Sequence, residues 1–370
     1  MLESLFALIL SGLSFPLILY FSEARGYAPA LFFALSAYTI LTGNWNGAPW
    51  SKVLTFWICL ILGFLSHATF ILVLTALMTY SFFHEIRRSS TIYQKALHLF
   101  TYYALPLLLF FLFYLFYLSD IQVGGGPIHT TWDVLCQTTL VVLGFPDTPL
   151  LRILSIISAA SIISGGIYIL FKEGDDRWVF FAVILFVAPL LLISITQPEF
   201  LYFRYFILCF PFFYILLSYL LGKLYRASFK GAKIVFILLI LLYLAGQSQR
   251  IIPLLHLRRG NYNALLQDIA THSENKLIRV GSDNDHRNLM LVVFYAQCLP
   301  EGTQIQYVER SNWQQERPDW MIAHSQKQDI QPLQHLNLPE IGPYEFVKTY
   351  GYSGFSGWSW FLYRAKQTVQ

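Results

Sequence analysis

The sequence predicts an α-helical polytopic membrane protein of about nine spans with a water-soluble α/β domain at its C-terminal end. Of its 370 residues, 56% are hydrophobic and 17% are aromatic, which is typical of polytopic membrane proteins. Residues 1–246 contain 23 charged side chains, and residues 247–370, half as long, contain another 23. The lipid core excludes charge and selects apolar runs of about 20 residues. We therefore expect a transmembrane helical domain over residues 1–246 and an extracytoplasmic α/β domain over residues 247–370.

The individual spans follow from uninterrupted apolar runs. Runs such as Ala104–Leu118 and Ile234–Ala245 are apolar on every side, so they leave no face for water. For Val53–Phe83, Gly63 and the pair Ser66-His67 favour a tight hairpin, and one long tilted helix is the alternative. The expected spans are residues 5–21, 27–43, 53–65, 67–83, 97–118, 151–171, 178–196, 205–221 and 234–246.

The basic residues of the short loops predict the orientation. With a cytoplasmic N-terminus, ten Lys and Arg residues fall in inner loops and three, Arg25, Arg152 and Arg204, in outer ones, as the positive-inside rule requires. An odd number of spans then places the C-terminal domain outside. We expect a multi-pass protein of a bacterial-type inner or plasma membrane.

The C-terminal domain alternates helix-like and strand-like patterns. Helices are expected over Asn261–Thr271 and His286–Cys298. Strands are expected over Lys276–Gly281, Gln304–Val308, Trp320–Ala323, Tyr344–Thr349 and Trp358–Tyr363. Gly281-Ser282-Asp283 follows a strand but lacks the further glycines of a dinucleotide-binding turn. In the long outer loop, residues 119–150, Trp132–Leu143 predicts a short helix lying along the interface.

Polar residues at the outer ends of spans are the candidates for a functional site. Arg25, His67 and Arg204 lie in three outer turns, and two arginines with a histidine would form an electropositive pocket suited to a lipid phosphate. Supporting residues are Glu23, Tyr27, Tyr202 and Tyr205. The alternatives are structural: interfacial anchoring by the arginines, a local Glu23–Arg25 pair, and a turn role for His67. The four cysteines have no spacing typical of a metal site.

Four short segments resemble polytopic C-type (GT-C) glycosyltransferases, relatives of protein O-mannosyltransferases and lipid A aminoarabinose transferases. The run Tyr20-Phe21-Ser22-Glu23-Ala24-Arg25-Gly26-Tyr27-Ala28 resembles their S-x-E-A-R-P-Y-A segment. The runs Gly63–Thr69 and Arg204-Tyr205-Phe206 followed by Pro211 are similar to two further segments. The ending Tyr352–Arg364 resembles the outer domain of some bacterial members. The resemblance covers most of the chain in order.

The resemblance implies a donor sugar on a polyprenyl phosphate, moved to an extracytoplasmic glycan, lipid or protein acceptor. Arg25, Arg204 and His67 would bind the donor phosphate. The resemblance implies no further cofactor and no nucleic acid, and it leaves a divalent metal requirement open. Other function classes stay open: a non-catalytic flippase for lipid-linked saccharides, a polymerase or ligase, and an assembly partner.

Two departures from the family pattern concern catalysis. Gly26 replaces the usual proline, and the family's catalytic carboxylate lies in an outer loop before the first matched segment. We therefore expect a truncated member or a relocated base. The outward candidates for this base are Glu199, the first choice, then Asp120, with Asp133 and Asp147 as further candidates.

Overall fold

The computed structural model describes residues 2–23, 25–43, 49–120, 129–196, 201–325, 330–355 and 357–366. The chain divides into two compact units, residues 1–248 and 249–370. This division lies two residues after the predicted boundary at 246/247.

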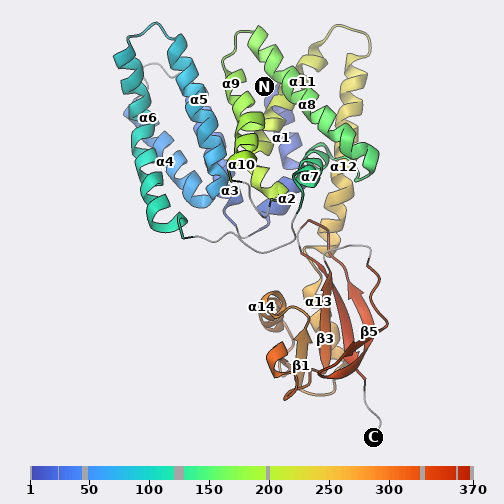
Figure 1. The fold of residues 1–370 in the computed structure, drawn as a ribbon. Helices are drawn as coiled ribbons and strands as arrows, with labels where there is room; N and C mark the ends of the chain where they lie inside the picture. Colours follow the sequence, from blue (N-terminus) through green and yellow to red (C-terminus); the bar gives the residue numbers. More distant parts are fainter. Residues whose placement is uncertain are drawn as a thin grey trace. The chain divides into compact units, whose positions relative to one another are not determined.

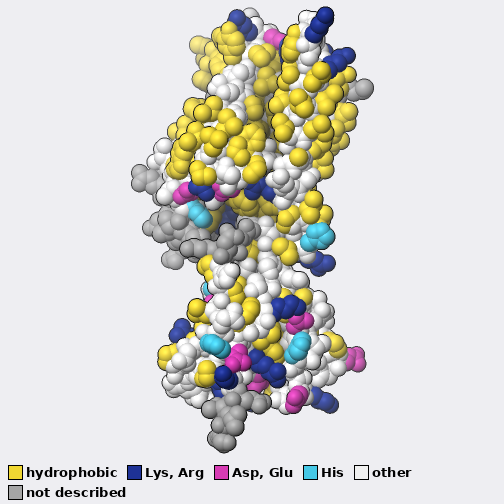
Figure 2. Space-filling view, turned by 90° about the vertical axis from the view of Figure 1, so that its right-hand side faces the viewer, with side chains coloured by type: hydrophobic (Ala, Val, Ile, Leu, Met, Phe, Trp, Pro, Cys, Tyr) yellow, Lys and Arg dark blue, Asp and Glu magenta, His cyan; other side chains and the backbone are white. Residues whose placement is uncertain are grey.

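The first unit is helical throughout (Figure 1). Its surface in Figure 2 is mainly hydrophobic between charged residues at its ends. Neighbouring pairs include α3 with α4, α1 with α11, and α7 with α8. Its elements are α1 (Leu2–Gly12), α2 (Phe15–Phe21), α3 (Tyr27–Thr42), α4 (Trp50–Ser66), η1 (Ala68–Phe70), α5 (Ile71–Arg87), α6 (Ile92–Phe113), η2 (Tyr114–Leu118), α7 (Thr131–Leu143), α8 (Pro149–Lys172), α9 (Arg177–Ala182), η3 (Val183–Val187), α10 (Ala188–Thr196), η4 (Phe203–Cys209), α11 (Phe210–Arg226) and α12 (Ala232–Leu257).

The described helices support a membrane protein with fewer full-length spans than nine. Six are long and apolar enough to cross a bilayer, and the bent pair α1 and α2 makes a seventh if it forms one span. The segments expected as spans 27–43 and 53–65 form α3 and α4, of 16 and 17 residues. At 1.5 Å per residue, these are shorter than a hydrocarbon core about 30 Å thick.

Residues 5–21 form two helices instead of one continuous span, with a bend of 63° between α1 and α2. The bend frees backbone groups, and α12 satisfies them. The hydroxyl of Tyr243 donates to the carbonyl oxygen of Leu10 at 2.6 Å, and the Phe15 amide donates to Oε1 of Gln247 at 2.8 Å. Such partners are required where a helix breaks away from water.

The stretch Val53–Phe83 is divided at His67 into α4 and the η1–α5 segment, which excludes one continuous helix. The short helix predicted over Trp132–Leu143 is present as α7, which Thr130 caps by accepting a hydrogen bond from the Asp133 amide at 3.1 Å. All four cysteines are free.

The second unit contains a six-stranded sheet in the order β2-β1-β3-β6-β5-β4. Strands β1, β2 and β3 are parallel, and β3, β6, β5 and β4 pair antiparallel. All predicted helices and strands of this region are present within a few residues, and β4 was not predicted. The elements are α13 (Tyr262–His272), β1 (Leu277–Ser282), α14 (Asp285–Ala296), β2 (Gln304–Tyr307), η5 (Arg310–Asn312), β3 (Trp320–Ser325), β4 (His335–Leu338), β5 (Gly342–Tyr350) and β6 (Ser359–Ala365).

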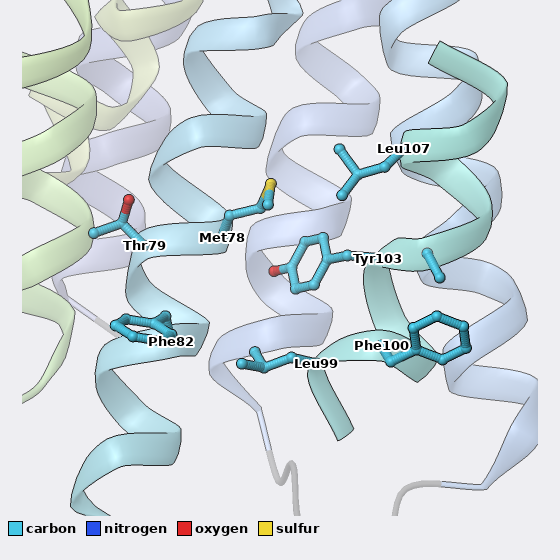
Figure 3. A pocket seen from close by; sticks show the side chains of 8 residues that line it. Met78, Thr79, Phe82, Leu99, Phe100, Tyr103 and Leu107 are labelled. Carbon is cyan, nitrogen blue, oxygen red and sulfur yellow. The ribbon is translucent and has the colours of Figure 1, made fainter. Parts of the chain in front are cut away.

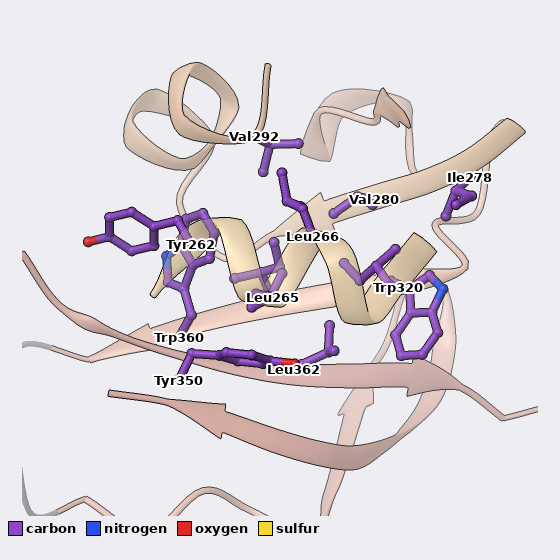
Figure 4. Packing of buried hydrophobic residues seen from close by; sticks show 12 residues of the cluster. Tyr262, Leu265, Leu266, Ile278, Val280, Val292, Trp320, Tyr350, Trp360 and Leu362 are labelled. Carbon is purple, nitrogen blue, oxygen red and sulfur yellow. The ribbon is translucent and has the colours of Figure 1, made fainter. Parts of the chain in front are cut away.

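Alternating residues of the strands bury both faces of this sheet. On β6, Trp360 and Leu362 join the cluster formed with α13 and α14, whereas Phe361 and Tyr363 join a second cluster with Trp313. Figure 4 shows the first cluster, with Leu265 and Leu266 of α13 directed toward the strands. The second unit therefore has a hydrophobic core of its own.

Candidate functional site

The first part of the candidate site is the turn between α2 and α3. The amide of Arg25 donates to the carbonyl oxygen of Glu23 at 2.7 Å, and the amide of Tyr27 donates to that of Arg25 at 2.8 Å. The Arg25 Nε lies 3.3 Å from Oε2 of Glu23, whose side chain is only 3% exposed, while that of Arg25 is 52% exposed. Arg25 therefore pairs with a buried carboxylate and still reaches solvent.

The second part is His67, which lies between α4 and η1. Its ring stacks on Tyr27 with the centroids 4.3 Å apart. The Thr69 amide donates to His67 Nδ1 at 3.3 Å, and the Thr69 hydroxyl lies 2.8 Å from the same nitrogen. Because Nδ1 accepts, the neutral ring carries its proton on Nε2.

The third part is Arg204 in η4. Its guanidinium carbon lies 4.4 Å from the ring centre of Tyr202 and 5.9 Å from that of Tyr205. The preceding residue, Phe203, contacts Tyr20 of α2 with ring centroids 5.6 Å apart, and Tyr20 contacts Tyr27 at 5.0 Å. This chain of rings connects η4 to the turn before α3.

These three parts meet in one place. The charges of Arg25 and Arg204 both act on Tyr20, Tyr27 and His67. Coulomb interactions weaken with distance and are screened by salt, so these five side chains lie close together. We call Tyr20, Arg25, Tyr27, His67 and Arg204 the two-arginine cluster. The structure brings together Arg25, His67 and Arg204, the three residues predicted to bind phosphate.

Electrostatics keep the histidine of this cluster uncharged near neutral pH. His67 lies in the turn before the Ala68–Arg87 helix. Burial, followed by repulsion from Arg25 and Arg204, lowers the pKa of His67 to about 4, because both effects disfavour the imidazolium. The cluster therefore has two cationic guanidinium groups and one neutral N–H donor.

Close backbone packing fixes the relative positions of the first two parts. A Cβ on Gly26 would lie 1.7 Å from the carbonyl oxygen of Ser66, and one on Gly63 would lie 2.2 Å from the ring of Phe70. Two glycines thus allow the start of α3, the end of α4 and η1 to meet. This contact is a physical reason for glycine at position 26, where the resembled segment has proline.

The candidate bases are placed differently. Glu199 lies outside the described residues. Asp120 is exposed at the end of η2 and accepts a hydrogen bond from Ser119, and no contact of the described residues joins it to the two-arginine cluster. Asp133 and Asp147 both pair with Arg152, at 3.7 and 2.7 Å. The carboxylate that does adjoin the cluster is Glu23.

Sequence reasoning missed three aromatic residues at this site. Tyr20 and Phe203 link its parts, and His129 contacts Tyr202 with ring centroids 5.4 Å apart. Tyr20 is the first residue of the segment that resembles the family, and Phe203 directly precedes Arg204. These positions in or beside the matched segments are a signal that could have identified Tyr20 and Phe203, whereas His129 lies outside the matched segments and has no such signal.

Two further observations limit the chemistry of the first unit. Among the residues that the structure describes, no group of three or more His, Cys, Asp or Glu side chains could hold a metal ion. A hollow of about 430 Å³ lies between α5 and α6 (Figure 3), lined by Met78, Thr79, Phe82, Leu99, Phe100, Tyr103, Ala104 and Leu107. This lining has no carboxylate, amine or imidazole, and its one phenol, Tyr103, hydrogen-bonds to Ser81 at 2.7 Å, so the hollow provides mainly apolar contact.

Comparison of the sequence with protein-family models and curated proteins, and of the fold with solved structures, found no match.

Proposed function

We propose that this chain is a membrane glycosyltransferase that takes a sugar from a polyprenyl-phosphate donor and transfers it to an extracytoplasmic acceptor. The observation that supports this proposal is the convergence of Arg25, His67 and Arg204 from three separate segments. The proposal includes the nine-span topology, the cytoplasmic N-terminus and an external α/β domain, as well as the bacterial-type inner or plasma membrane.

The two-arginine cluster suits a phosphate chemically. A guanidinium group offers parallel N–H donors that match two phosphate oxygens, and Arg25 is half exposed. The Nε2–H of neutral His67 would add a third donor. In transfer, the acceptor hydroxyl attacks the anomeric carbon, the bond from that carbon to the phosphate oxygen breaks, and the cations stabilise the leaving lipid phosphate. The acceptor proton goes to a carboxylate base.

Donor binding is the direct test. Arg25→Ala and Arg204→Ala should each weaken the binding of a polyprenyl-phosphate sugar by about 10- to 100-fold, because each removes a charge-assisted contact worth about 1.5–3 kcal/mol. The lysine variants should recover only part of this loss. Arg152→Ala is the matched control, since Asp133 and Asp147 already engage that arginine. If both alanine variants bind the donor with wild-type affinity, these arginines only anchor the protein at the membrane interface.

The bend between α1 and α2 favours a second candidate, a flippase for lipid-linked saccharides. Transporters use broken helices whose free ends face the substrate, and the sequence analysis did not predict this break. Here Tyr243 and Gln247 occupy the freed groups at Leu10 and Phe15. Side chains of the protein therefore already hydrogen-bond the backbone groups that a transported substrate would need, which makes transport the weaker candidate. Transbilayer movement of a fluorescent polyprenyl-phosphate lipid in proteoliposomes would support the flippase instead.

A further inference from the structure

The sheet of the second unit has a point where the strand order reverses. Strands β1 and β3 are parallel neighbours, yet β1 continues through α14 to β2 on one side, and the chain after β3 reaches β4 at the opposite edge. In open sheets with parallel strands, ligands bind outside the carboxyl ends at such a point. In this chain, that position lies beyond Ser282 and Ser325.

A carboxylate and an imidazole are coupled at this position. Asp283 directly follows β1, and His324 is near the end of β3. The His324 ring Nδ1 lies 2.7 Å from Asp283 Oδ1, and the His324 amide donates to Oδ2 at 3.0 Å. Because Nδ1 donates to the carboxylate, Nε2 of the neutral ring is a hydrogen-bond acceptor. The two side chains are 40% and 23% exposed.

An aromatic ring and a guanidinium group adjoin this pair. The Trp358 ring lies 6.0 Å from that of His324, centroid to centroid. The guanidinium carbon of Arg287, in the first turn of α14, lies 4.7 Å from the Trp358 ring centre. We call Asp283, Arg287, His324 and Trp358 the switch-point group.

Buried hydrogen bonds hold the turn that carries Asp283 in place. The Asn288 side chain, fully buried, donates to Ser282 Oγ at 2.5 Å and accepts from the Trp360 indole at 3.0 Å. The Ser282 hydroxyl oxygen also accepts from the Asn284 amide at 3.2 Å. The turn that carries Asp283 is therefore fixed to α14 and β6, as a preorganised binding site requires.

We propose that the switch-point group binds a neutral saccharide. The indole of Trp358 packs partly against the core of the second unit, and the part of the ring that stays exposed provides an apolar contact for the C–H side of a sugar ring. The planar groups of Asp283, Arg287 and His324 offer both donors and acceptors for hydroxyl groups. The charges of Asp283 and Arg287 cancel, so the group favours a neutral polyol over a phosphate. That this saccharide is the acceptor rests on the proposed function, whereas its binding does not.

The test is an array of immobilised neutral and acidic oligosaccharides probed with the purified full chain in lipid nanodiscs. The wild-type chain should bind neutral oligosaccharides. Trp358→Ala and His324→Ala should each weaken this binding about tenfold, the effect of losing one good stacking or hydrogen-bond contact. Asp283→Asn keeps the side-chain size and should weaken it as well. His335→Ala, a change at an exposed histidine of β4, should bind as wild type does.

Three results would overturn the saccharide site: no oligosaccharide bound by the wild-type chain, binding that survives all three variants, or displacement by inorganic pyrophosphate in preference to free sugar. An Arg25→Ala, Arg204→Ala double variant separates the two proposals. It should lose donor binding and keep array binding. If the wild-type chain binds oligosaccharides but no lipid-linked donor, the acceptor role fails while the saccharide site stands.

Discussion

Gly26 packs directly against the backbone of Ser66, because a Cβ on residue 26 would lie 1.7 Å from the Ser66 carbonyl oxygen. Its φ of −66° is accessible to any residue, so space and not backbone conformation requires glycine. The contact joins the turn that carries Arg25 to the turn that carries His67. The geometry of the two-arginine cluster therefore depends on a residue that has no side chain.

We expect Gly26→Ala to separate these turns and to weaken donor binding, although residue 26 has no polar group to contact phosphate. A backbone carbonyl cannot give way cheaply, so the cost should resemble core overpacking, about 1–3 kcal/mol. Gly165→Ala in α8 is the control, since its Cβ would meet nothing within 4 Å. Thermal stability in detergent and donor affinity would be measured together. Equal behaviour of the two variants would contradict this role of Gly26.

Gln247 is expected to stabilise the break between α1 and α2. Besides accepting from Phe15, its Nε2 donates to the carbonyl oxygen of Val141 at 3.0 Å, and its side chain is buried. Gln247→Leu would leave two buried backbone groups without this partner, at about 1–3 kcal/mol each. The melting temperature in detergent should fall, whereas Gln249→Leu, at an exposed position, should change it little. A fall of the same size in both variants would mean that added hydrophobicity is the cause.

The sequence predicted best where one local pattern decides the structure. The change in charge density lies near the division at residue 248, and short strand-like runs rich in apolar residues predicted β1, β3 and β6. The strand β4, His335–Leu338, was missed because Asn337 and the following Pro339 are residue types that are depleted in strands and typical of turns. Its existence depends on a neighbouring strand and not on its own pattern.

The bend at residues 12–14 shows where apolar runs mislead. By hydropathy alone, residues 5–21 form one apolar run. Ser14 at the N-cap and Pro16 in the first turn nevertheless indicate that a new helix starts there. The cluster also shows what sequence alone does not supply. A shared membrane side suggested that Arg25, His67 and Arg204 converge, whereas the ring contacts of Tyr20 and Phe203 that join them are tertiary.

The second unit should lose stability in acid through Asp268 of α13. The side chain accepts hydrogen bonds from Lys348 at 2.6 Å and from Tyr350 at 2.5 Å. Burial alone would raise the pKa of Asp268, but these two bonds outweigh it and lower the pKa below its ordinary 3.8. A lowered pKa in the folded state contributes stability above the unfolded-state pKa, and this contribution is lost as pH falls through the folded-state value.

Residues 255–370, which contain the whole core of the second unit, provide the material for this experiment. Melting followed by circular dichroism between pH 7 and about pH 2 should show a steeper acid decline for wild type than for Asp268→Asn, which has no charge to lose. Glu301→Gln, a change at an exposed residue, should leave the decline unchanged. Parallel curves for wild type and Asp268→Asn would refute the assignment to this carboxylate.

Topology can be tested with a native cysteine. Cys298 is exposed, and the other three cysteines are buried, so a membrane-impermeant maleimide should label Cys298 in intact cells if the second unit is external. In a Cys298→Ser background, Ser228→Cys between α11 and α12 should react only after permeabilisation. Labelling of Cys298 only after permeabilisation would reverse the predicted orientation.

Turnover is expected to be weak even where donor binding is strong. Asp133 and Asp147 are engaged by Arg152, Asp120 is exposed at η2, and Glu23 is paired with Arg25. A positioned base contributes about 10²–10⁴-fold to rate, and none of these described carboxylates is both near the arginines and unengaged by a cation. Binding and transfer should therefore separate in an assay of the purified chain with a panel of polyprenyl-phosphate sugars.

The amide variants of Asp120, Asp133, Asp147 and Glu199 identify a relocated base if one exists. Rapid transfer abolished by Glu199→Gln alone would assign the base to the segment five residues before Arg204 and contradict the expectation of weak turnover. Asp133→Asn and Asp147→Asn should instead lower thermal stability slightly, since each loses a partly exposed ion pair worth at most about 1 kcal/mol. Glu23→Gln distinguishes the remaining possibility: it keeps the size of the side chain, so loss of transfer with donor binding intact would make Glu23 the base, whereas loss of both would make it a support for Arg25.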